Sequence, residues 1–301
     1  MHNASASHLS SKIKLIKLIQ NALTNHSGFS LGKIGFSEQF FLNHPMVMQL
    51  SLNSRQLSAY QSLANVHCLR QSGVFPTDFK FLTSFSDFFS KSVSRLDVLG
   101  LFGAPQELEI ISRYQLSCCF LKYQDTEPDR SIPNNINVCY LPLFKNKRVL
   151  LVAPFAHFLQ DRAQANIFES VWQKTKKPWF DPHSVDSIEF PYAYELKTQK
   201  QFGDVLNLYE HICQKIDSKQ FDVALIAAGA LAIPLADYIK SKNKIALSLG
   251  GHLQVLFGVK GSRWKNDPVW PKQYFTQAWV DMPATYHPAN KDNLTDAGAY
   301  W

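Results

Sequence analysis

The sequence predicts an α/β protein with a Rossmann-like, mostly parallel sheet and helices on both faces. Apolar runs rich in β-branched residues recur at 147–155, 221–230 and 244–251, and strands buried on both faces of a parallel sheet have this composition. Stretches with helical periodicity separate these runs, and this alternation is typical of βαβ units. In a doubly wound fold, ligands bind outside the carboxyl ends of the strands.

The first half of the chain alternates helical and strand-like stretches. Its expected elements are a first helix at 10–23, a strand at 29–34, a helix at 37–50 capped by Ser37, a helix at 54–71, a helix at 77–96 capped by Thr77, a strand at 97–103 and a helix at 105–114. The segment 123–137 is polar and contains prolines, so we expect a loop. Lys12, Lys14 and Lys17 make the first helix amphipathic. It either packs on the fold, which we favour, or lies on a membrane surface.

The second half has a more regular pattern. Its expected elements are a strand at 147–155, a helix at 157–175, an extended segment at 185–193, a helix at 202–217, a strand at 221–230, a helix at 233–243 and a strand at 244–251. The strands near residues 98, 149, 222 and 245 should form the centre of the sheet. We expect an N-terminal extension over 1–27 and one α/β domain over 28–301, with two lobes at 28–140 and 141–301 as the alternative.

The amino-acid composition limits the classes of function that the protein can have. The 301 residues carry a net charge of +7, which favours anionic partners, but we find no nucleic-acid-binding motif. The five cysteines are odd in number and form no Cys-x-x-Cys pair, so a disulfide framework or zinc site is not expected. No signal peptide and no apolar run long enough for a membrane span occurs. We therefore expect a soluble, cytoplasmic protein.

The stretch LGGHLQVLFGVKGSRW, at the end of the last predicted core strand, concentrates ligand-binding residue types. Gly250 and Gly251 permit positive φ and a close approach of the backbone to a ligand. Lys260 and Arg263 supply positive charge for phosphate, and Trp264 could stack on a base or sugar. The structural alternative is an ordinary tight turn followed by solvated cations.

Three further candidates follow from the same strand ends. His252 and Gln254 could donate hydrogen bonds to a substrate, and His157 follows the strand at 147–155. Gly229 turns a strand sharply into a helix, whose N-terminus attracts phosphate. Each of these has a purely structural alternative, such as a cap or a turn.

The turn GKIGFSE follows the first predicted strand. Lys33 and Gly35 could contact an anion there, and Glu38 could act as a general base, a sugar-hydroxyl acceptor or a metal ligand. A carboxylate that only stabilises the N-terminus of a helix is the alternative.

These motifs, taken in order, resemble a bacterial family found with capsule and O-antigen biosynthesis genes. The segments that carry the resemblance are GKIGFSE, GVFP, DVLGLF, KRVLLVAPF, FDVALIAAGALAIPLADYIK, LGGHLQVLFGVKGSRW and the terminal GAYW. Members of that family often carry GAYGLPLA, LGGALQLLFGIKGKRW and GGCYW. The resemblance extends from about residue 28 to Trp301.

More remotely, the start of the chain resembles glycosyltransferases of the D fold. In those enzymes, an Arg-x-Gly-Asp-Gly-Glu turn supplies an Asp-x-Glu pair for a metal and a nucleotide sugar. Glu38 matches that glutamate, but Phe36 stands where the aspartate would be. This departure favours a transferase that needs no divalent metal, in which Lys33, Lys260 or Arg263 stabilises the leaving diphosphate.

The resemblance implies a glycosyltransferase that moves a sugar from a nucleotide-diphosphate donor to a bacterial surface polysaccharide. Its co-substrate would be a nucleotide sugar and its partner a glycan acceptor, at the inner face of the membrane if the protein associates with it. One alternative is a nucleotide- or glycan-binding protein without turnover, and another is a methyl or pyruvyl transferase. The hypothesis requires Glu38 to share one cleft with Gly251 and Arg263.

Overall fold

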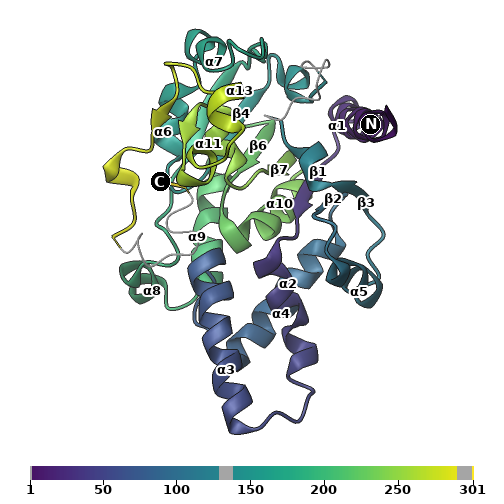
Figure 1. The fold of residues 1–301 in the computed structure, drawn as a ribbon, viewed down its shortest axis with the longest axis vertical. Coiled ribbons are helices and arrows are strands. Elements are labelled where there is room, and N and C mark those ends of the chain that lie inside the picture. The colour runs from purple at the N-terminus through teal and green to yellow at the C-terminus, as the bar shows by residue number, and fades with distance from the viewer. Residues whose placement is uncertain (1, 129–137, 290–299) are drawn as a thin grey trace.

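The computed structural model describes residues 2–128, 138–289 and 300–301, and it confirms the α/β fold with a parallel sheet (Figure 1). All neighbouring strands of the seven-stranded sheet are parallel, in the order β3-β2-β1-β7-β6-β4-β5. The strands are β1 Phe29–Lys33, β2 Val98–Leu101, β3 Cys119–Lys122, β4 Arg148–Val152, β5 Ser184–Ile188, β6 Val223–Ile226 and β7 Ile245–Ser248. A small parallel pair, β8 Val259–Lys260 and β9 Val280–Asp281, lies apart from this sheet.

The four strands expected at the centre are all internal to the sheet. Strands β2, β4, β6 and β7 each pair with a neighbour on both sides, and β6 and β7 are buried along their whole length. The extended segment expected at 185–193 forms the edge strand β5. Strand β3, at the other edge, was not expected, because its apolar run is only a few residues long.

Helices cover both faces of the sheet, as expected. The first face is covered by α2 Phe36–Val47, α4 Phe79–Ser94, α9 Val205–Asp217 and α10 Ala232–Ser241. The second face is covered by α1 His2–Thr24, α6 Ala156–Arg162, α7 Ala165–Val171 and α11 His252–Leu256. The remaining α-helices are α3 Ser54–Ala64, α5 Pro105–Arg113, α8 Leu196–Phe202, α12 Ser262–Lys265 and α13 Trp270–Gln273. Helices α2, α3 and α4 project from one end of the molecule (Figure 1).

Several helix boundaries differ from the sequence-based expectation. Helix α2 begins after Gly35 rather than after Ser37, and α4 begins after Asp78, whose carboxylate accepts the Phe81 N–H at 2.9 Å. Thr77 does not cap α4, because its hydroxyl group donates a hydrogen bond to the Asn65 side chain. The helix expected at 157–175 is two helices, α6 and α7.

The helix expected at 54–71 changes its winding halfway. Helix α3 ends at Ala64, and residues Asn65–Gln71 continue as a π-helix. In a π-helix each N–H group donates to the carbonyl five residues earlier, and such turns within α-helices frequently occur at functional sites. This segment ends beside the carboxyl edge of the sheet, where Arg70 and Gln71 line a cleft.

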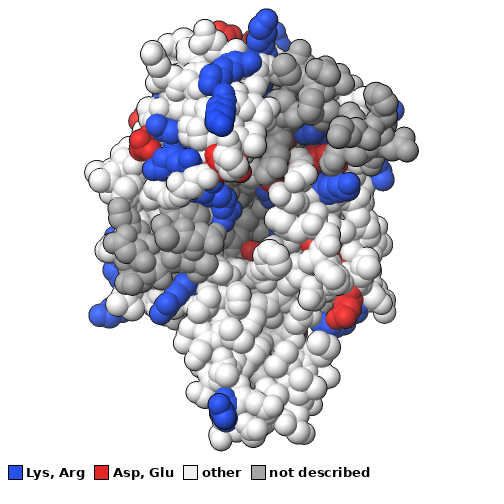
Figure 2. All heavy atoms as spheres, viewed as in Figure 1, with Lys and Arg blue, Asp and Glu red and all other residues white. Residues whose placement is uncertain are grey.

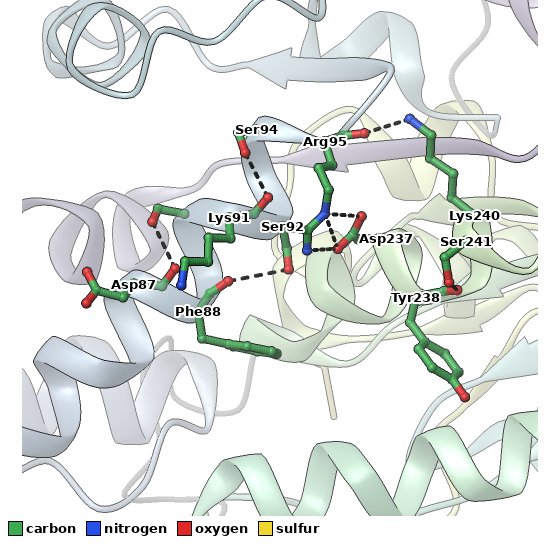
Figure 3. A network of polar contacts seen from close by, with 11 residues as sticks. Asp87, Phe88, Lys91, Ser92, Ser94, Arg95, Asp237, Tyr238, Lys240 and Ser241 are labelled. Atoms are coloured by element: carbon green, nitrogen blue, oxygen red, sulfur yellow. Dashed lines mark hydrogen bonds and ion pairs between the residues drawn. The ribbon is translucent and has the colours of Figure 1, made fainter.

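Helix α10 is fixed over β1 and β7 by charged contacts with the end of α4 (Figure 3). The Arg95 guanidinium group donates to both carboxylate oxygens of Asp237. The Lys240 ammonium group donates to the Arg95 carbonyl at 2.6 Å and to Asp97 at 2.8 Å. Asp97 also accepts the Ser30 N–H of β1 at 2.8 Å. These contacts hold α10 so that its N-terminus lies at the carboxyl edge of the sheet.

The first helix packs against the rest of the fold. Leu15 and Ile19 of α1 are buried in the same core cluster as Leu31 of β1. Lys12 is also buried, and its ammonium group donates to the carbonyl of Glu127 at 3.4 Å. Among the helices that the structure describes, none has the length and apolar character needed to cross a bilayer.

Candidate functional site

The candidate site lies at the carboxyl ends of β1 and β7, where the connections that follow the two strands run to opposite faces of the sheet. These two strands are neighbours, but β1 leads to α2 on the first face and β7 leads to α11 on the second face. Such a topological switch point leaves a crevice outside the carboxyl ends of the strands, which is the usual ligand position in this fold class.

A cleft of about 680 Å³ occupies this position, and a hollow is visible near the middle of the face shown in Figure 2. The cleft is lined by predicted site residues from three strand ends. They are Lys33, Gly35 and Glu38 after β1, Gly229 after β6, and Gly250, Gly251, His252, Arg263 and Trp264 after β7. Folding thus brings Glu38, Gly251 and Arg263 to one cleft, as the hypothesis requires.

Glu38 lies in the first turn of α2, with its carboxylate folded back over the turn. Its Oε2 atom accepts the Gly35 N–H at 2.9 Å. A Cβ atom at position 35 would come within 2.7 Å of this oxygen, so glycine permits the close approach. Burial raises the pKa of Glu38 above its ordinary value of 4.5, against the opposing effects of backbone hydrogen bonds and of Lys33. A carboxyl group with a raised pKa can exchange a proton closer to neutral pH.

A buried acid, Glu127, joins two predicted site residues at the floor of the cleft. Its Oε1 atom lies 3.0 Å from Nε2 of His252 and 3.5 Å from Nζ of Lys33, and its side chain is only 1% exposed. Lys33 also donates to the Leu249 carbonyl at 3.0 Å. Glu127 was not among the predicted site residues, because it follows β3 in a segment expected to be a loop. Glu127 fixes the side chains of Lys33 and His252 and balances the charge of Lys33.

Aromatic side chains form much of the cleft wall. Phe36 is 72% exposed, and Phe102 stacks on Tyr123 with ring centroids 4.0 Å apart. Trp264 is only 2% exposed, because its ring packs in an aromatic cluster that includes His252. Phe36 and Phe102 therefore offer more surface for stacking on a sugar or base than Trp264 does.

Three predicted site residues lie outside the cleft, which corrects their assignment. The imidazole of His157 pairs with Glu189 at 2.9 Å beside β5 and away from the cleft lining. Lys260 belongs to β8 and pairs with Asp281 at 3.5 Å. Gln254 has no exposed surface, and its amide group donates to two backbone carbonyls, one in β8 and one near the C-terminus. Each side chain is held by partners of its own and is not available to a ligand in the cleft.

The π-helix adds polar groups that the sequence analysis did not single out. Gln71 accepts a hydrogen bond from the Ser37 hydroxyl at 2.8 Å, and its Oε1 atom lies 2.9 Å from Nδ1 of His67. This connects the π-helix to the first turn of α2, beside Glu38. Arg70, one residue earlier, is exposed and lines the cleft.

No group of three or more His, Cys, Asp or Glu residues with metal-binding geometry occurs among the described residues. Comparisons with known protein families, with curated proteins and with solved structures found no match. The resemblance to capsule- and O-antigen-associated proteins therefore stays a prediction from the sequence.

Proposed function

We propose that the protein is a glycosyltransferase that moves a sugar from a nucleotide-diphosphate donor to a bacterial surface polysaccharide. One observation carries the proposal: Glu38, Gly251 and Arg263 line a single cleft at the switch point of a parallel sheet. The exposed aromatic rings of Phe36 and Phe102 in the same cleft suit a sugar or base. The proposal places the reaction in the cytoplasm, with the acceptor at the inner face of the membrane.

The chemistry of sugar transfer assigns distinct roles to the groups in the cleft. The acceptor hydroxyl group loses its proton to the Glu38 carboxylate while its oxygen bonds to the anomeric carbon. The bond from that carbon to the diphosphate breaks, and the diphosphate leaves with the electron pair. Lys33 and Arg263 compensate the negative charge that develops on it. Glu38 must be ionised to accept the proton, so its raised pKa sets the acidic limb of the rate profile.

The proposal assigns charge compensation to these side chains rather than to a divalent metal. Its basis is the replacement of the metal-binding aspartate of the D-fold turn by Phe36. Turnover should therefore persist in excess EDTA, and loss of turnover that Mg²⁺ or Mn²⁺ restores would contradict this part of the proposal.

Release of nucleoside diphosphate from a panel of nucleotide sugars tests the proposal. Glu38→Gln should reduce release by about 10²- to 10⁴-fold, the usual contribution of a general base. Asp204→Asn is the matched control, because Asp204 also caps a helix N-terminus, accepting the Asn207 N–H at 2.9 Å, but lies outside the cleft lining. Equal release by wild type and Glu38→Gln would show that Glu38 is not the base.

The second candidate is a nucleotide- or glycan-binding protein without turnover. It is favoured by the hydrogen bond from the Gly35 N–H to Glu38, which gives this carboxylate a capping role in the absence of any ligand. Calorimetry that shows nucleotide binding, without turnover of any donor and acceptor pair, would support it. A thermal-shift comparison of UDP, GDP, CMP and S-adenosylmethionine would detect a methyl transferase, since a bound ligand raises the apparent stability.

A further inference from the structure

We propose that Arg70, Ser248 and the backbone at the start of α10 form the subsite that binds the diphosphate of the donor. The inference rests on the proposed function for the identity of that donor. Neither side chain was a candidate in the sequence. Both line the cleft, as does Gly229 in the turn before α10.

Ser248 is the last residue of β7 and points to the face of the sheet that α10 covers. It is in register with Ile226 of β6, and Ile226 packs in the core cluster that contains α10. Side chains paired across neighbouring strands point to the same face. Ser248 is 5% exposed, lines the cleft and has a hydroxyl group with no hydrogen-bond partner among the residues that the structure describes. The Ser248 oxygen is not among the fully buried polar atoms that lack a partner, so the hydroxyl group is open to the cleft and can bind a polar ligand there.

Ala232 and Ile233, at the start of α10, line the same cleft as this hydroxyl group. A 3-10 turn at Gly229–Leu231 leads into the ten-residue helix, and Gly229 has φ of +52°. The Leu231 and Ala232 N–H groups already donate to the Ala228 and Gly229 carbonyls, and Pro234 has no N–H group. The Gly229 and Ala230 N–H groups donate to no described carbonyl, and they lie at the positive end of the helix. Because the Gly250 N–H donates to the Ile226 carbonyl at 3.2 Å, the turns after β6 and β7 are held next to each other. Backbone donors and the hydroxyl group therefore converge on one part of the cleft.

The end of the π-helix adds a positive charge to the same place. A Cβ atom at Gly229 would come within 2.5 Å of the Ser72 carbonyl oxygen, so this segment packs directly on the turn. Arg70 precedes Ser72 and lines the cleft, and it makes no hydrogen bond or ion pair with any described residue. By contrast, Arg95 and Arg148 are each paired with an aspartate. A free guanidinium group has the planar fork that matches two phosphate oxygens.

The acidic side chains that line the cleft do not cancel the positive charge of Arg70. Glu127 lies beside both Lys33 and His252. Asp267 also lines the cleft, and its Oδ1 atom accepts the Val269 and Trp270 N–H groups at the start of α13. Burial raises the pKa of Glu38, which favours its neutral form relative to an exposed glutamate. The side of the cleft next to α10 is therefore electropositive, and a pyrophosphate group is the ligand chemistry that its donors fit.

Isothermal titration of the full chain with inorganic pyrophosphate tests the subsite without a nucleoside or a sugar. Arg70→Gln should weaken binding by about 10- to 100-fold, the value of a charged hydrogen bond, and Ser248→Ala by about 2- to 10-fold, the value of a neutral one. Arg55→Gln is the matched control, because Arg55 is exposed, lies in the first turn of α3 and is absent from the cleft lining. It should bind pyrophosphate as wild type does.

Two results would overturn the subsite: no binding of pyrophosphate to the wild-type chain, or equal binding by wild type, Arg70→Gln and Ser248→Ala. Binding that is lost in Arg263→Gln but is unchanged in Arg70→Gln and Ser248→Ala would place the anion at Arg263 without the subsite and would also overturn it. The outcome is separate from that of the proposed function. Pyrophosphate binding that depends on Arg70, with no turnover of any nucleotide sugar, would support the subsite and contradict glycosyl transfer.

Discussion

Two glycines of the cleft have nearly the same backbone conformation but different surroundings, and alanine substitutions should separate their roles. Gly229 has φ of +52° and Gly250 has φ of +56°. A Cβ atom at Gly229 would lie 2.5 Å from the Ser72 carbonyl oxygen, whereas a Cβ atom at Gly250 would meet no atom within 4 Å. Gly229→Ala should therefore be the more destabilising change, and Gly250→Ala should mainly affect the ligand.

The expected magnitudes follow from these contacts. A left-handed conformation is unfavourable for alanine by about 1–2 kcal/mol, and the lower entropy of the unfolded chain offsets about 0.4–1 kcal/mol of this. The net loss of unfolding free energy for Gly250→Ala is thus about 1 kcal/mol. For Gly229→Ala, displacing the Ser72 backbone adds about 1–3 kcal/mol, the usual range for overpacking, which gives a total of about 2–4 kcal/mol.

Urea denaturation of both variants measures these losses from the transition midpoint and the slope. Titration with a nucleoside diphosphate should show that Gly250→Ala, although nearly as stable as wild type, binds about tenfold more weakly or worse, because its methyl group occupies the position of closest backbone approach. Equal destabilisation by the two substitutions, or a larger effect for Gly250→Ala, would refute the reasoning. Wild-type affinity in Gly250→Ala would show that no ligand approaches this turn.

Substitutions at three positions, Glu38, Glu127 and Asp222, test the electrostatics. Burial raises the pKa of Glu38, so between pH 4.5 and the raised pKa the native state binds more protons than the unfolded state does. The unfolding free energy of the wild type therefore falls across this range as pH rises. The stability of Glu38→Gln relative to wild type should therefore increase with pH in urea denaturation, and a constant difference would contradict the assignment. Glu127→Ala leaves the partly buried Lys33 without its counter-charge and should lower the unfolding free energy by about 3–5 kcal/mol. Glu127→Gln should lower it less. In urea denaturation, a loss below about 1 kcal/mol for Glu127→Ala would show that the ion pair is not important for stability. Hydrogen bonds from Arg148 lower the pKa of Asp222 below 3.8, so its stabilisation is complete above that pH and is lost as pH falls through the lowered value. Asp222→Asn should therefore be less stable than wild type near neutral pH, with the gap closing in acid, and a gap that persists in acid would contradict this.

The sequence predicted those parts of the fold that depend on local pattern. Long apolar runs such as 221–230 and 244–251 identified the inner strands, because a strand buried on both faces can be recognised without its neighbours. The positions of the strand ends followed from the same runs, and so did the meeting of Glu38 with Gly251. Strand β3 was missed, because its short run carries little periodic signal.

The site residues that were not predicted from the sequence depend on contacts that no local pattern encodes. Glu127 reaches Lys33 only because the segment after β3 packs against β2 and α1, and Arg70 reaches the cleft only because α3 continues as a π-helix. Conversely, His157 and Lys260 looked like ligand contacts, but each pairs with an acid that is distant in sequence. A polar or charged residue near a strand end can belong to a binding site only when its side chain is not already held by another residue of the protein.

A crystal structure with a bound nucleoside diphosphate would show whether the cleft between β1, β6 and β7 binds the diphosphate of a nucleotide donor. We expect diphosphate density at the start of α10, in contact with Arg70 and Ser248, with Glu38 and Phe36 facing the sugar position. Density instead in the second cleft, lined by Lys197, Lys215 and Tyr286, or an empty switch-point cleft at saturating ligand, would contradict it.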